Sequence, residues 1–250
     1  MKPIRRSTKQ CLAGVTCLLA FACAGAAVAA DAPVSARRPA DTMAERVVAC
    51  VACHGEQGRA TTDGYYPRIA GKPAGYLFNQ LVNFREGRRQ NATMRYLVAN
   101  LPDAYLQEIA DHFAAQNPPY AAPQPPVASA AVLERGRVLV SGGDASKGLP
   151  ACATCHGSAL TGTAPAVPGL IGLPRDYLNA QFGAWSNRVR RAAAPDCMAQ
   201  ITSRLSAEDL GAVTAYLAAQ TVPPHAVPAM AAASDPKAPL ECGSMRRGAP

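Results

Sequence analysis

The sequence predicts an all-α protein that contains two similar helical domains in tandem. Three observations lead to this prediction: an internal duplication, apolar residues spaced three and four positions apart, and a proline-dense stretch between the two copies. A chain of 250 residues is long enough for two small domains. We expect domains at 40–117 and 128–222, joined by a Pro-rich linker at 118–127 and followed by a Pro- and Ala-rich tail at 223–250.

The duplication is clearest around two tyrosines and two methionines. Tyr76 begins the segment Tyr-Leu-Phe-Asn-Gln-Leu, and Tyr177 begins the similar segment Tyr-Leu-Asn-Ala-Gln-Phe. Met94 and Met198 each lie 22 residues before the glutamine of an Ala-Ala-Gln segment. Such internal similarity implies two copies of one structural unit.

Each copy is expected to contain three main helices. The last helix of each copy follows from apolar residues at helical spacing, namely Leu106, Ile109, Ala110 and Phe113, and Leu210, Val213 and Leu217. Ser206 is expected to cap the second of these helices, and Pro102 to occupy the first turn of the other. The remaining helices are expected at 42–49, 76–84, 130–140 and 177–185. No alternating pattern indicates a strand.

Each copy also carries the motif Cys-x-x-Cys-His, which is the attachment sequence of c-type haem. Its residues are Cys50, Cys53 and His54 in the first copy, and Cys152, Cys155 and His156 in the second. The two thiols of such a motif add to the porphyrin vinyl groups, and the histidine binds iron. A shared four-cysteine zinc site gives histidine no reason to follow both pairs, and a thioredoxin-like motif would follow a strand. The sequence therefore predicts two covalently bound haems.

The second iron ligand in each copy is expected to be methionine. Met94 and Met198 are the methionines at equivalent places, whereas Met43, Met230 and Met245 have no repeat partner. A thioether ligand favours reduced iron and raises the potential. The alternative is a core methionine that fills a packing gap. The duplicated placement favours the ligand.

Cys197 leaves three alternatives open because it adjoins Met198. It could form a disulfide with Cys242, remain a free buried thiol, or bind iron as a thiolate. An exported protein can keep disulfides, and this one would pin the tail to the second domain.

Residues 1–30 are expected to be a signal peptide. A positive head precedes an apolar stretch that ends in small residues before Asp31. Cleavage is favoured over an uncleaved anchor helix because Ala and Gly dominate the second half of that stretch. The expected location is the periplasm.

The charge of the chain gives no basis for nucleic-acid binding. The formal net charge is +8, and loss of the four basic residues of the leader leaves 21 basic against 17 acidic residues, or +4. The four propionates of two haems would bring the holoprotein close to neutral.

Two basic clusters occupy similar places in the copies. They are Arg85, Arg88 and Arg89, and Arg188, Arg190 and Arg191. Three interpretations remain open: a solvated loop, pairing with haem propionates, or a docking patch for an acidic partner.

Over about residues 41–222 the chain resembles the dihaem cytochrome c4 family. The resemblance rests on the two haem motifs, the Pro-Arg-Ile-Ala-Gly segment at 67–71, the Tyr-Leu-x-x-Gln helices and the spacing from methionine to the last helix. It implies a small all-α fold around each of two haem c groups. The axial ligand pairs that it implies are His54 with Met94, and His156 with Met198.

The resemblance implies a periplasmic carrier that transfers electrons between respiratory partners, commonly toward a terminal oxidase. Its expected partners are redox proteins, namely an electron donor and a terminal oxidase or dehydrogenase, and it would associate with the membrane only through them. The alternatives are a dihaem oxidoreductase of the thiosulfate-dehydrogenase type and a cytochrome subunit of a periplasmic dehydrogenase. A methionine in both copies favours the carrier.

Overall fold

Helices provide nearly all the regular structure of the part of the chain that the computed structural model describes, residues 41–224, 226–230 and 240–245. These residues belong to one compact unit that spans Ala40–Pro250. The predicted signal peptide at 1–30 lies outside the described residues. Within the described ranges, no helix is long and apolar enough to cross a membrane.

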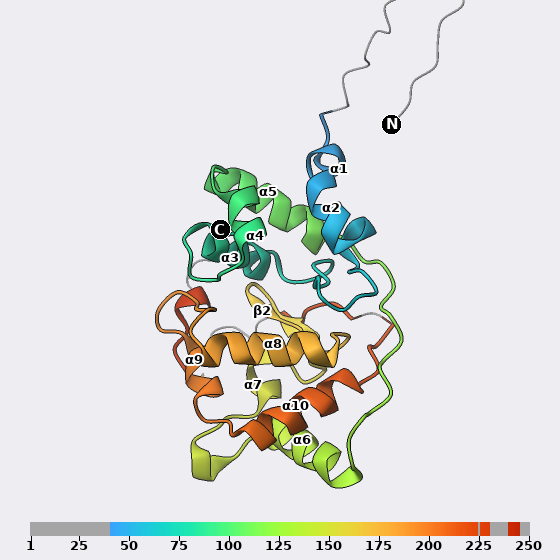
Figure 1. The fold of residues 1–250 in the computed structure, drawn as a ribbon, viewed down its shortest axis with the longest axis vertical. Coiled ribbons are helices and arrows are strands. Elements are labelled where there is room, and N and C mark those ends of the chain that lie inside the picture. The colour runs from blue at the N-terminus through green and yellow to red at the C-terminus, as the bar shows by residue number, and fades with distance from the viewer. Residues whose placement is uncertain (1–40, 225, 231–239, 246–250) are drawn as a thin grey trace, which may run out of the picture. The chain divides into compact units, whose positions relative to one another are not determined.

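The first sequence repeat is built around two long helices. Its helices are α1 (Met43–Arg46), α2 (Val48–His54), α3 (Ala74–Arg85), α4 (Ala92–Val98) and α5 (Asp103–Ala114), with a 3-10 turn at Glu56–Gly58. Helix α3 packs against α5 and α4 (Figure 1). Leu106 and Phe113 of α5 are almost completely buried, as the apolar spacing of this helix predicts.

The second sequence repeat has a similar order of elements and a small hairpin. Its elements are α6 (Ala130–Gly142), a 3-10 turn at Ala145–Lys147, α7 (Cys152–His156), β1 (Gly162–Thr163), β2 (Val167–Pro168), α8 (Arg175–Ser186), α9 (Cys197–Thr202) and α10 (Ala207–Ala218). Helix α10 lies against α6 (Figure 1). The contact is close at Gly136, where a Cβ atom would lie 2.2 Å from the Ala212 carbonyl oxygen. Only glycine allows this approach.

The all-α prediction is confirmed, with differences in detail. The helix expected at 42–49 is two helices that meet at Val47, and the second of them continues through the haem motif. Ser206 caps α10 as predicted, and its hydroxyl accepts from the Asp209 amide at 3.1 Å. Pro102 precedes α5 in an extended conformation rather than lying in its first turn.

The short elements that the sequence pattern did not predict are α4, α9 and the antiparallel hairpin β1–β2. Their apolar patterns are too short to be distinguished from loop. The predicted linker at 118–127 contains no helix or strand. A further 3-10 turn at Gly243–Met245 belongs to the tail.

Candidate haem-binding sites

The two cysteines of each motif lie one helical turn apart, on α2 in the first repeat and on α7 in the second. Both helices end at the motif histidine because a glycine follows with positive φ, 75° at Gly55 and 82° at Gly157. Among the described residues, the four motif cysteines form no disulfide. Burial raises the pKa of Cys50, and it raises the pKa of Cys152 to about 11.

Each motif histidine is held by a backbone carbonyl. The Nδ1 atom of His54 lies 2.9 Å from the Pro67 oxygen, and that of His156 lies 2.7 Å from the Pro168 oxygen. A carbonyl only accepts, so Nδ1 must donate and Nε2 keeps its lone pair. Burial lowers the pKa of both imidazoles and favours the neutral form that binds metal. This is the arrangement expected of iron-ligating histidines.

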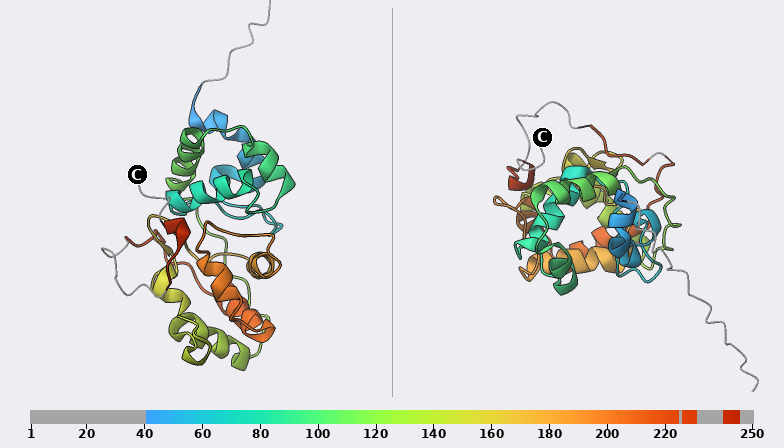
Figure 2. Two further views of the ribbon diagram at one scale, coloured as in Figure 1. Left: turned by 90° about the vertical axis from the view of Figure 1, so that its left-hand side faces the viewer. Right: turned by 90° about the horizontal axis from the view of Figure 1, so that it is seen from above.

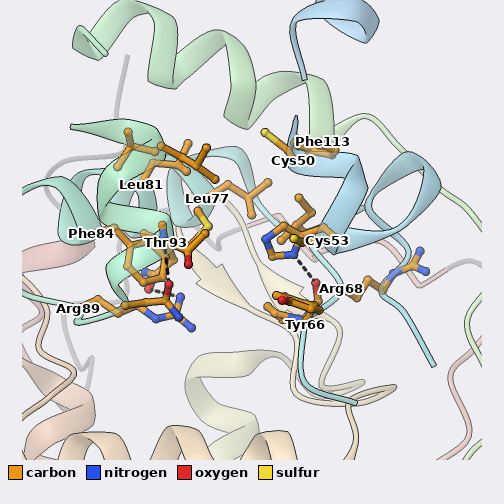
Figure 3. Close-up of a pocket in the computed structure, with 18 of the residues that line it drawn as sticks. Cys50, Cys53, Tyr66, Arg68, Leu77, Leu81, Phe84, Arg89, Thr93 and Phe113 are labelled. Atoms are coloured by element: carbon orange, nitrogen blue, oxygen red, sulfur yellow. Dashed lines mark hydrogen bonds between the residues drawn. The ribbon is translucent and has the colours of Figure 1, made fainter. Parts of the chain in front are cut away.

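A cavity of about 760 Å³ adjoins the first motif. Its lining includes Cys50, Cys53, His54 and Met94, which are the four predicted haem-binding residues of this repeat. Figure 3 shows the cysteines on one wall, with Leu81, Phe84 and Thr93 opposite and Tyr66 and Arg89 along one edge. A cavity of this size and apolar lining suits a large flat cofactor.

A second cavity, of about 180 Å³, adjoins the second motif. Its lining contains the equivalent set, Cys152, Cys155, His156 and Met198. The structure therefore brings together all four predicted residues in each repeat.

The two methionines lie on the short helices α4 and α9, each held by a polar cap. The Asn91 side chain accepts from the Met94 amide at 2.9 Å. Asp196 caps α9 by accepting from the Ala199 amide at 3.0 Å. A side-chain oxygen at this position satisfies an otherwise unpaired amide of the first turn. The caps therefore fix where each methionine enters its cavity.

Two arginines from the basic clusters join the repeats. Arg89 donates to Gln80, Tyr177 and Gln181, whereas Arg190 donates to Gln181, Tyr76 and Gln80. Backbone bonds run beside them, from the Gln90 amide to Val189 (2.9 Å) and from the Arg191 amide to Arg88 (2.7 Å). Arg190 is only 5% exposed. The solvated-loop interpretation is therefore wrong for this pair.

The cations at this junction are suited to holding anions. Within the described residues, the hydrogen bonds of Arg89 and Arg190 go to neutral oxygens. Lys72 is also buried beside both cavities, and burial lowers its pKa. Burial opposes ionisation of Tyr76, yet the Arg190, Arg89 and Lys72 charges prevail and lower its pKa to about 8. Cations whose side-chain partners are not carboxylates fit the propionates of haem, whereas the thiols fit its vinyl groups and the imidazoles fit its iron.

Arg68 is a site residue whose role the sequence did not reveal. Its guanidinium donates to the Pro118 and Pro119 carbonyls, and it lies 3.8 Å from the centre of the Tyr120 ring. Its Nε atom is buried and has no hydrogen-bond partner within the described part of the chain. Arg68 lines the first cavity, so it ties the linker to the haem site. The paired roles of Pro67 and Pro168 were also missed, although both prolines follow their histidines at nearly equal spacing.

A disulfide joins Cys197 to Cys242, with Cα atoms 5.4 Å apart. Of the three alternatives for Cys197, the structure therefore has the disulfide. The bond places the tail beside Met198, on the second cavity.

No model of a protein family matches the chain. Individual proteins do. The chain is 36% identical over 177 residues to the thiosulfate dehydrogenase electron acceptor of Thiomonas intermedia, which covers 70% of this chain and 80% of that protein. It is 30% identical over 174 residues to cytochrome c4 of Pseudomonas aeruginosa, which covers 69% of this chain and 84% of that protein.

Solved structures give the same result. Reduced cytochrome c4 from Pseudomonas stutzeri superposes with a TM-score of 0.62 at 26% identity, over 71% of this chain and 96% of that chain. Thiosulfate dehydrogenase from Marichromatium purpuratum also gives 0.62, at 30% identity, but this chain covers only 36% of it. With two haem motifs, two helical repeats and these relatives, the chain belongs to the dihaem cytochrome c4 family of electron-carrying proteins.

Proposed function

We propose that this protein is a periplasmic carrier that accepts electrons from a thiosulfate-oxidising dehydrogenase and passes them toward a terminal oxidase. One observation carries the proposal. Each cavity brings two thiols, a histidine with Nδ1 committed to a carbonyl, and a methionine to one place. Such a set fills both faces of an iron and leaves no position for a substrate.

The ligand assignment follows from these sets. Cys50 and Cys53 would attach the first haem, and Cys152 and Cys155 the second. The axial ligands would be His54 with Met94, and His156 with Met198. The bound groups supply one-electron redox chemistry. The protein would hold these groups through the cysteines and axial ligands and would limit the access of water to them.

The junction between the repeats would serve transfer between the two haems. Tyr76, Gln80, Tyr177, Gln181 and Arg190 line both cavities. These side chains would therefore hold propionates from both sides and keep the two sites close. The domain limits of 40–117 and 128–222 belong to this proposal.

The donor class is suggested by the relatives. Two of them, from Thiomonas intermedia and Stutzerimonas stutzeri, bear the name thiosulfate dehydrogenase electron acceptor. The dihaem-enzyme alternative requires an open iron position or a thiolate ligand. Cys197 does not favour it, because its sulfur is bonded to Cys242. That disulfide also agrees with an exported protein.

The test is a reduction assay on purified holoprotein made in a host that matures c-type cytochromes. Thiosulfate with a catalytic amount of thiosulfate dehydrogenase should reduce both haems, and thiosulfate alone should reduce neither. The oxidised protein should show the sulfur-to-iron charge-transfer band from both sites. Turnover of thiosulfate by this protein alone, or a high-spin haem, would contradict the carrier function. Failure with this dehydrogenase but reduction by another donor would contradict only the partner.

A further inference from the structure

We propose that residues 240–245 of the C-terminal tail form a covalently attached strap that positions Met198, with Cys197, Cys242 and Asn79 as positioning residues of the second site. The inference rests on the proposed function because it assumes that Met198 binds iron. It predicts that an added ligand displaces Met198 from iron less readily when the strap is attached than when it is released.

The strap is fastened directly beside the ligand. The Cys197–Cys242 disulfide joins the tail to the first residue of α9, and Met198 is the second. The Gly243 amide donates to the Pro195 carbonyl at 2.9 Å. A Cβ atom at Gly243 would lie 2.1 Å from the Ala194 carbonyl oxygen. Only glycine permits so close an approach, so the tail is seated on the loop that precedes α9.

The strap also reaches the first repeat. The buried Asn79 side chain of α3 donates through Nδ2 to the Ser244 carbonyl at 2.9 Å. Figure 2 shows the dark red turn at Gly243–Met245 next to the helices of both repeats. Leu240, Cys242, Ser244 and Met245 line the same cavity as Met198. The strap is therefore a wall of the second site.

An earlier part of the tail is fixed as well. The Ala229 carbonyl accepts from the Ala164 amide at 2.8 Å, and the Ala229 amide donates to the Gly162 carbonyl at 2.9 Å. The hairpin thus gains a short parallel neighbour. The tail is attached to the second repeat at two separate places.

Comparison with the first repeat indicates why the second methionine would need a strap. Thr93 occupies the position of Cys197 there, and among the described residues the Met94 helix has no covalent tie. The stretch from Gln181 to Met198 is 17 residues, whereas the stretch from Gln80 to Met94 is 14. A longer loop loses more entropy when its end is fixed, and a cross-link reduces that loss. The disulfide therefore compensates for the longer loop at the second ligand.

The test measures binding of carbon monoxide to the reduced holoprotein, because this ligand must displace methionine. The variant is the double substitution Cys197→Ser with Cys242→Ser, since a single change would leave a free thiol beside the iron. We expect carbon monoxide affinity at the second haem to rise by about tenfold. This is a modest change compared with the stabilisation that a disulfide across a loop usually supplies. The first haem should change by less than about twofold. NMR signals of the two ligand methyl groups assign the sites.

Two matched variants separate positioning from general stabilisation. Asn100→Ala removes an exposed asparagine of the first repeat that lines neither cavity, and it should leave both affinities unchanged. Asn79→Ala keeps the disulfide, removes one anchor, and should raise affinity at the second haem by about two- to threefold, about the loss of one weak hydrogen bond. It therefore tests the strap even if the double variant yields no holoprotein. The strap is disproved if Asn79→Ala leaves the second haem unchanged, or if both haems respond equally. Absence of the sulfur-to-iron charge-transfer band in the oxidised, unaltered protein would instead contradict the proposed function.

Discussion

The cavity of the first repeat measures about 760 Å³, whereas that of the second measures about 180 Å³, although both are lined by two cysteines, a histidine and a methionine. The histidine contacts are also equivalent, at 2.9 and 2.7 Å from a proline carbonyl. The differences lie around the ligands. The second repeat has a hairpin, a longer loop before its methionine and a tail fastened by a disulfide.

The comparison indicates that the predicted haem-binding residues and the residues around them come from different parts of the chain. The ligands come from short segments that were duplicated with the repeat, so they keep the same geometry. The surroundings come partly from outside the repeat, because tail residues within 240–245 line the second cavity. Two sites with the same ligands can therefore differ in how firmly those ligands are held.

The largest expected effect is the loss of one low-spin haem site while the other site is retained. His156→Ala removes the imidazole whose Nδ1 is held by Pro168, so the second iron loses an axial ligand and its low-spin spectrum. We expect the first repeat to keep a low-spin haem and its helices. Optical spectra of the reduced protein and circular dichroism measure both outcomes.

The matched variant is His54→Ala, which should give the reverse pattern. The two repeats are then self-sufficient around their own haems. Loss of both spectra from either single substitution would show instead that the repeats fold only together.

The next effect concerns the junction, where Arg190 is buried and Arg89 only partly so. Arg190→Gln should lower the free energy of unfolding by about 2–3 kcal/mol, because it leaves Tyr76, Gln80 and Gln181 oxygens with fewer donors and exposes the Trp185 face. Arg89→Gln should cost about 1 kcal/mol. Urea unfolding of the oxidised holoprotein measures the difference.

A redox titration sharpens the same comparison. Removing a positive charge near both haems favours oxidised iron, so both reduction potentials should fall in Arg190→Gln. A fall at only one haem would mean that Arg190 serves a single site.

Much of this architecture could be predicted from the sequence because it depends on local pattern. The helices with long apolar periods and the cap at Ser206 are local features, and so are the haem motifs. The contacts of Arg89 and Arg190 across the two repeats could not be predicted, since the sequence does not reveal that the repeats meet through these side chains. The Cys197–Cys242 bond remained one of three alternatives because it joins segments 45 residues apart. Helices α4 and α9 were missed because six or seven residues give no clear period.

The smallest expected effect concerns the ion pairs at the start of the last helices. Asp209 of α10 is 7% exposed in its side chain and accepts from Arg135 at 2.8 Å and from Lys147. The Arg135 hydrogen bond, aided by Lys147, outweighs burial and holds the pKa of Asp209 below its usual value. A lowered pKa in the folded state contributes stability above the ordinary value of about 4, and this contribution is lost as pH falls through the folded value.

Asp209→Asn should therefore lower the free energy of unfolding by about 1–2 kcal/mol at pH 7 and by less near pH 3. In the first repeat, Asp103 pairs with Arg85 but is 68% exposed. Asp103→Asn should change stability by no more than about 0.5 kcal/mol, because an exposed ion pair is screened by solvent. Urea unfolding between pH 3 and 7 compares the two variants. If the two variants lose equal free energy of unfolding, then the burial of Asp209 does not make the second repeat more sensitive to acid than the first.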